Sequence, residues 1–162
     1  MRVGDSRVDG RGSDIRSSSL TNSGRSTGRD DAFDVDDATD ISGGITNSGT
    51  ITAENDAFTV YSSTDISGNI TNTGIITAGD DAFQVYSSST ISGAITNSGT
   101  IEADRFAFVV FSTSDISGTI TSSGTITAGD VAFFVFTSDL RRSTTNLGTI
   151  PADDSAFSVN AS

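Results

Sequence analysis

A repeat of 25 residues is the feature that most constrains the fold of this chain. The segment from Thr39 to Ala53, TDISGGITNSGTITA, returns in related form at this spacing through most of the 162 residues. About six units can be aligned, the first of them degraded. Because one unit cannot bury its own apolar side chains, successive units have to stack to form a continuous core.

The spacing of apolar residues inside a unit indicates short strands. Ile51 and Ala53, and then Phe58 and Val60, are each two residues apart, which is the period of a strand with one buried face. Asn, Gly and Asp separate these stretches, as expected at turns. The sequence therefore predicts an all-β fold: a right-handed parallel β-helix of about six coils, with three short strands per coil.

The chain divides into two regions by composition. Residues 1–29 are rich in Arg, Gly, Ser and Asp, and we expect a disordered arm or a poor N-terminal cap. Residues 30–162 form the predicted β-helix domain, with an irregular last coil at 139–145, where the unit is one residue short and carries Arg141 and Arg142.

Composition excludes several classes of function. The chain has no His, no Cys and no Lys, so most catalytic constellations, thiol chemistry and Cys-based zinc sites cannot be built. No apolar run is long enough for a membrane helix, and no signal peptide is recognisable. The net charge of −12 disfavours nucleic acid. We therefore expect no enzyme, no cofactor, no nucleic-acid partner and no membrane insertion by this segment.

A polar column is expected to define one corner of every coil. Stacked asparagine amides can hydrogen-bond from coil to coil, and glycines two residues later are expected to supply a positive φ. The members of this structural turn ladder are Asn47, Asn72, Asn97, Asn146, Gly49, Gly74, Gly99, Gly124 and Gly148.

The repeat resembles a known class of bacterial surface proteins. The pattern Ile-x-Gly-x-Ile-Thr-Asn-Ser-Gly-Thr-Ile-x-Ala, followed by Ala-Phe-x-Val, resembles the passenger repeats of autotransporters and related adhesins, over residues 39–162. The resemblance implies a right-handed β-helix on the cell surface or secreted, exported across the outer membrane through a C-terminal β-barrel. This chain carries neither an export signal nor a barrel, and its last coil has no recognisable cap. We therefore expect a fragment of a longer protein, with end-to-end self-association as one consequence of an unprotected end.

Acidic residues recur at one bend and are candidates for binding Ca²⁺. Carboxylates in successive coils could share a cation that takes 6 to 8 oxygen ligands. Asx turns and solubility explain the same residues, and the glycine-rich nonapeptide of calcium-binding β-rolls is absent. The candidates are Asp56, Asp80, Asp81, Asp104, Asp130, Asp153 and Asp154.

A second candidate is a stripe of outward-facing aromatic residues. By parity with the inward Phe and Val columns, these side chains should face solvent. They either stack as a ladder covered by another domain or form a docking surface for a partner or a carbohydrate. The stripe consists of Tyr61, Tyr86, Phe111 and Phe136, flanked by Val109 and Phe134.

Two further hypotheses have less support in the sequence. Thr-Ile-Thr motifs resemble the arrays of β-helical antifreeze proteins, but Ile75, Glu102 and Pro151 interrupt them. A polysaccharide hydrolase could work with carboxylates alone, but it needs a singular pair of them, whereas the Asp residues recur in nearly every coil.

The sequence therefore predicts a non-catalytic structural stalk or adhesin-like passenger segment. Its partners would be a host or neighbour-cell surface or matrix glycans. The alternative is a carbohydrate-binding or polysaccharide-degrading β-helix, and the second alternative is a calcium-stabilised or ice-binding solenoid.

Overall fold

The chain folds into a parallel β-solenoid, seen in a computed structural model that describes residues 2–3, 8–9, 19–36, 40–61, 65–86, 90–113, 115–137 and 139–161. About half of the predicted N-terminal arm, residues 1, 4–7 and 10–18, therefore lies outside the described residues. Every pairing between strands is parallel, and within the regular coils residues 25 apart are partners, as Ile70 is with Ile45 and Ile95. The described chain makes about five coils, close to the predicted number.

The coils build four sheets, which we call A, B, C and D. Sheet A contains β1 (Arg2–Val3), β3 (Leu20–Asn22), β7 (Ile45–Asn47), β11 (Ile70–Asn72), β15 (Ile95–Asn97), β19 (Ile120–Ser122) and β22 (Thr144–Asn146). Sheet B contains β2 (Val8–Asp9), β5 (Phe33–Asp36), β9 (Phe58–Tyr61), β13 (Phe83–Tyr86), β17 (Phe108–Thr113), β21 (Val131–Thr137) and β23 (Ser155–Ala161). Sheet C contains β4 (Arg25–Gly28), β8 (Thr50–Ala53), β12 (Ile75–Ala78), β16 (Thr100–Ala103) and β20 (Thr125–Ala128). Sheet D contains β6 (Asp40–Ile41), β10 (Asp65–Ile66), β14 (Thr90–Ile91) and β18 (Asp115–Ile116).

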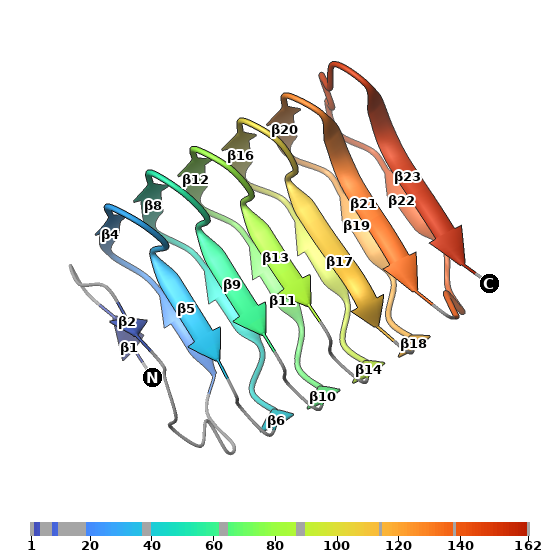
Figure 1. The fold of residues 1–162 in the computed structure, drawn as a ribbon, viewed down its shortest axis with the longest axis horizontal. Helices are drawn as coiled ribbons and strands as arrows, with labels where there is room; N and C mark the ends of the chain where they lie inside the picture. Colours follow the sequence, from blue (N-terminus) through green and yellow to red (C-terminus); the bar gives the residue numbers. More distant parts are fainter. Residues whose placement is uncertain are drawn as a thin grey trace.

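Figure 1 shows the direction of winding. The strands of sheet B run down the front, the chain crosses at the two-residue strands of sheet D, and the strands of sheet A return behind them. The stack advances at the same time from the blue coil of β4 and β5 to the red coil of β22 and β23, which makes the solenoid right-handed. The two end coils lie at opposite ends of the rod.

The prediction of three strands per coil is wrong in one detail. The stretch that contains Ile41 and Ile45 was expected to be one strand, but it forms two, because the chain bends at Ser42 to Gly44. Gly44 has a φ of +80°, a left-handed conformation that favours glycine. Each regular coil therefore has four strands.

The start of the solenoid also differs from the predicted boundary at residue 30. Strands β3 and β4 pair with β7 and β8, and Leu20 and Ser26 are buried. Residues 20–28 therefore belong to the stack. Leu20, Asn22 and Ser26 occupy the repeat positions of Ile45, Asn47 and Ile51, and they fill the first coil.

Columns of identical side chains fill the interior. The phenylalanines of sheet B stack with ring centroids 4.6 to 4.9 Å apart and planes within 17° of parallel. Offset stacking of this kind adds to the free energy gained by burying each ring. The column consists of Phe33, Phe58, Phe83, Phe108, Phe133 and Phe157. Isoleucines from the other three sheets complete the core, for example Ile41, Ile45 and Ile51.

The asparagine ladder lies inside the rod. Asn47 donates from Nδ2 to Oδ1 of Asn72 at 2.8 Å, and Asn72 donates in the same way to Asn97 at 2.8 Å. All three side chains are fully buried. Each of these side chains also forms a hydrogen bond with the backbone at the bend. For example, Oδ1 of Asn47 accepts the N–H of Gly49. In the last coil Asn146 is exposed, and among the described residues its side chain bonds only to the backbone of Gly148.

The predicted positive φ at the turn glycines is wrong. Among the described residues only Gly44 has a left-handed φ. The glycines are needed instead because the coils approach closely: a Cβ on Gly74 would lie 2.0 Å from the carbonyl oxygen of Gly49. The same clash recurs at Gly99, Gly124 and Gly148.

The last coil departs from the regular pattern. Thr144 pairs with Ile120 at an interval of 24 residues instead of 25, and sheet C is reduced to bridges at Thr149 and Ala152. Arg141 forms ion pairs with Asp115 at 3.2 Å and Asp139 at 3.0 Å across the shortened corner.

Candidate functional site

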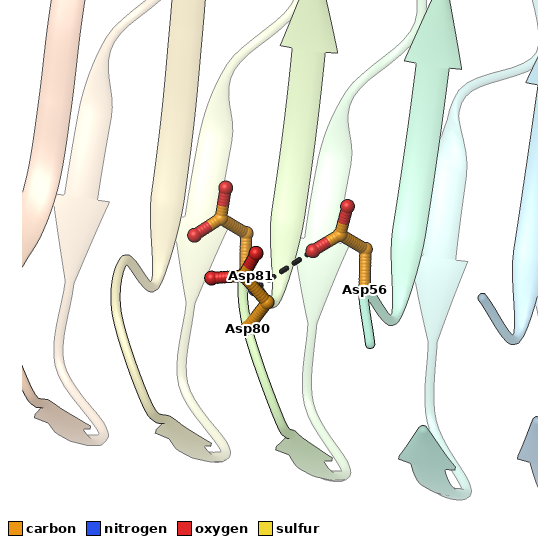
Figure 2. Close-up of side chains that lie close together, drawn as sticks. All are labelled: Asp56, Asp80 and Asp81. Carbon is orange, nitrogen blue, oxygen red and sulfur yellow. Dashed lines mark hydrogen bonds between the residues drawn. The ribbon is translucent and has the colours of Figure 1, made fainter. Parts of the chain in front are cut away.

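The acidic residues of the predicted calcium ridge fall into three neighbouring columns. Asp104 and Asp153 occupy the first column, Asp80, Asp130 and Asp154 the second, and Asp56 and Asp81 the third. Figure 2 shows the cluster that results where two columns meet: Asp56, Asp80 and Asp81 each offer an oxygen within 4.8 Å of the others. The other four candidates do not join this cluster.

The third column is a ladder of carboxylates that cap backbone groups. Oδ1 of Asp31 accepts the N–H of Asp56 at 3.1 Å. Oδ1 of Asp56 accepts the N–H of Asp81 at 2.8 Å, the bond drawn as a dashed line in Figure 2. Oδ1 of Asp81 then accepts the N–H of Phe106 at 3.2 Å. Buried backbone donors need such partners, so the ladder explains these aspartates without a ligand.

A chain of side-chain hydrogen bonds extends from the ladder. Gln84 donates from Nε2 to Oδ2 of Asp81 at 2.9 Å, and its Oε1 accepts the hydroxyl hydrogen of Tyr61 at 2.7 Å. Asp81 is only 1% exposed, and Gln84 is also buried. The repeat pattern did not predict this network. The signal in the sequence is the amide of Gln84, in a column that otherwise holds Asp34, Thr59, Val109, Phe134 and Ser158.

Burial shifts the proton affinities of the ladder. Loss of solvation raises the pKa of Asp56 to about 7, with the N–H of Asp81 acting in the opposite direction. The negative charges of Asp81, Asp31 and Asp80 raise the pKa of Asp56 further. Burial also raises the pKa of Asp81, against the hydrogen bond from Gln84. The cluster therefore holds less than its full negative charge near neutral pH.

The donor set does not fit a calcium ion well. Both oxygens of Asp80 accept from Nη1 of Arg105, at 3.0 and 3.1 Å. Both oxygens of Asp81, and one of Asp56, are also engaged. Ca²⁺ takes 6 to 8 oxygens, and these three carboxylates offer few that are free.

The aromatic stripe forms a stacked ladder on the outside of sheet B. Successive centroids of Tyr61, Tyr86, Phe111 and Phe136 are 5.6, 5.5 and 5.2 Å apart. Tyr61, Phe111 and Phe136 are 36% to 42% exposed. Tyr61 stacks on Tyr86 and Phe111 stacks on Phe136, whereas Tyr86 and Phe111 are tilted by 44°. A ring face that packs on a neighbouring ring is not open to a sugar, so the stacked pairs favour the ladder over a carbohydrate platform.

The predicted exposure of Val109 is wrong. Its side chain is 2% exposed, and Phe134 beside it is half-buried, in contact with Phe106 at a centroid distance of 5.3 Å. Parity does place Val109 on the outer face, but it lies between Gln84 and Phe134 on adjacent strands. Both neighbours have larger side chains than valine, which accounts for its burial.

Arg105 and Glu102 differ in charge from the residues at the same positions of the neighbouring coils, and they lie in different surroundings. Arg105 is held by Asp80 at 3.0 Å and lies 3.9 Å from Asp130, with its guanidinium carbon 4.8 Å from the ring centre of Phe106. Glu102 is exposed on sheet C, opposite Thr77 and Thr127. The threonine rows on this sheet are interrupted by Glu102 and by Ile75, which is 50% exposed.

No protein-family model, curated protein or solved structure gives a significant match to this chain. In the part of the chain that the structure describes, no helix is long and apolar enough to cross a membrane.

Proposed function

We propose that this chain is a non-catalytic structural stalk or adhesin-like passenger segment of a bacterial surface or secreted protein. The observation that carries the proposal is the even distribution of structural features. The Phe column runs from Phe33 to Phe157, and the buried Asn ladder repeats the same bond from Asn22 to Asn97. A catalytic or binding protein concentrates unlike polar groups in one place, whereas a stalk repeats the same ones.

The shape of the molecule supports a spacing role. The first and last coils lie at opposite ends of the rod, so the chain separates whatever precedes it from whatever follows it (Figure 1). Each added coil lengthens such a rod by about 4.8 Å, the distance between neighbouring strands. Repetition therefore adjusts length without changing the surface.

The cellular setting of the proposal depends on the resemblance of the repeats to autotransporter passengers. In that setting the segment is exported and exposed on the cell surface or secreted. Its partners are a host or neighbour-cell surface or matrix glycans, which other parts of the parent protein could contact.

Surface display tests the proposal. The segment is placed between an outer-membrane anchor and a labelled tip domain, and the distance from tip to membrane is measured by energy transfer. A stalk gives a narrow distance distribution, and duplicating residues 40–138, which are four coils, increases the distance by roughly 19 Å. An unchanged distance, or a distribution as broad as that of a Gly/Ser linker, contradicts the stalk.

A further inference from the structure

A polar groove runs along the corner between sheets D and A. Its volume is about 510 Å³, and its polar lining residues are Ser67, Asn69, Ser92, Ser117, Thr119 and Arg142. Gly93 and Gly118 also line it, but both residues are buried, so the side chains present most of its surface. The groove crosses three regular coils and ends at the irregular last coil. It lies away from the acidic cluster and the aromatic stripe, which belong to the bend before sheet B and to its outer face.

One serine hydroxyl per coil lines the groove. The backbone N–H groups of Ser67, Ser92 and Ser117 donate to the carbonyls of Ile41, Ile66 and Ile91 at 3.0 to 3.1 Å, so the three residues stand in register. Their hydroxyls are therefore spaced by about one strand separation, 4.8 Å. Within the described part of the chain, none of the three hydroxyls has a hydrogen-bond partner, so each is free to donate and accept.

Arg142 closes the C-terminal end of the groove and has no counterpart in the other coils. It follows Arg141, whose N–H donates to the carbonyl of Ile116, so Arg142 occupies the place that Gly118 has one coil earlier. Its Nε donates to the carbonyl oxygen of Ser117 at 3.1 Å, which directs the guanidinium back along the groove. Among the described residues it has no ion-pair partner, so both Nη groups are available.

The charges beside the groove favour an anion at this end. Asp115 and Asp139 are both paired with Arg141, at 3.2 and 3.0 Å. In the middle of the groove, Thr90 occupies the sheet D position that Asp65 and Asp115 have in the coils on either side. Asp65, half-buried and two residues before Ser67, lies at the opposite end of the groove from Arg142, and the more distant acidic groups are screened at physiological salt.

We propose that this groove binds an acidic oligosaccharide, a short chain of hexuronate units lying along the rod. The Arg142 guanidinium would bind one carboxylate through its two Nη groups, which suits the planar fork of Arg. The serine hydroxyls would donate to and accept from sugar hydroxyls. This binding goes beyond the stalk role, and the stalk does not depend on it.

Titration calorimetry with hexagalacturonate tests the proposal on the full chain. Arg142→Gln is expected to weaken binding by roughly tenfold to a hundredfold, because a charge-assisted hydrogen-bonded pair is lost. Arg25→Gln is the matched control: it makes the same change in net charge on an exposed strand of sheet C. It should leave the affinity unchanged. Cellohexaose, which is neutral, should bind at least tenfold more weakly than hexagalacturonate.

A second variant guards against loss of binding through unfolding. Ser92→Asp places a negative charge in the middle of the groove on an exposed side chain, and it should abolish binding without changing the melting temperature by more than a few degrees. The proposal is overturned if the unmodified chain shows no binding of hexagalacturonate at millimolar concentration. It is equally overturned if Arg142→Gln and Arg25→Gln behave alike, or if cellohexaose binds as tightly.

Discussion

Two neighbouring parts of the solenoid have the same backbone fold but different residues at the bend before sheet B. In the coils of β9 and β13, the position two residues before the inward Phe is Asp56 or Asp81, and it caps the next coil. In the coils of β17 and β21, the same position is Phe106 or Val131. The Phe column beneath them continues unchanged. The interior columns therefore determine the fold, and the outer columns can change from charged to apolar without altering it.

The inner column should matter equally in both parts. Phe83→Ala and Phe108→Ala each remove a buried ring stacked at 4.8 Å on both sides, and each should reduce the free energy of unfolding by about 3–5 kcal/mol. Chemical denaturation measures the loss. Phe136→Ala, on the outer stripe, should cost about 1 kcal/mol, because that ring is 42% exposed. Equal losses for Phe136→Ala and Phe83→Ala would show that inner and outer columns do not differ.

The asparagine ladder should be the next most sensitive feature. Asn72→Ala removes the acceptor of Asn47 and the donor to Asn97 inside the rod, and we expect a loss of about 2 kcal/mol. Asn146→Ala is the control in the last coil, where the amide is exposed, and it should cost less than about 1 kcal/mol. If Asn72→Ala reduces the free energy of unfolding no more than Asn146→Ala does, the buried ladder adds no net stability.

The part with the carboxylate ladder should respond to pH more strongly than the apolar part. The pKa of Asp56 is raised to about 7 in the folded chain, so the folded chain binds this proton more tightly than the unfolded chain does. The contribution of Asp56 to stability should therefore increase as pH falls through about 7 and level off below the ordinary value of 3.8.

Melting curves of Asp56→Asn between pH 4 and 8 measure this contribution. The variant should lose part of the pH dependence, whereas Asp104→Asn, with the same charge change on an exposed residue, should retain it. Parallel pH profiles for the two variants would contradict the shifted pKa of Asp56.

The smallest effect is expected at the border between the two parts. Arg105 pairs with Asp80 at 3.0 Å, but the Arg side chain is 51% exposed, so solvent screens the pair. Arg105→Gln should therefore change the free energy of unfolding by less than about 1 kcal/mol. A larger loss in denaturation would mean that the contact with the Phe106 ring contributes substantially.

The repeat was sufficient to predict the parallel solenoid and the residues of its core, because residues such as Phe58 and Ile51 recur with the period of a strand. Side-chain parity placed Val109 on the correct face but not at its true exposure, which depends on the size of neighbours on other strands. The bend at Gly44 and the clash that requires Gly74 depend on distances between coils. The sequence placed Asp56, Asp80 and Asp81 among seven candidates at one bend. It did not predict that these three would form the cluster, because that depends on the distance between columns.

The central claim is that coils stack in register at a constant spacing, and a distance between spin labels tests it most directly. The chain has no cysteine, so Thr27→Cys and Thr127→Cys can be labelled cleanly on the exposed face of sheet C. They lie four repeats apart, so the backbone positions should be roughly 19 Å apart, and duplicating residues 65–89 should increase this to roughly 24 Å. A broad distribution, or a distance that the duplication leaves unchanged, would contradict the stacked solenoid.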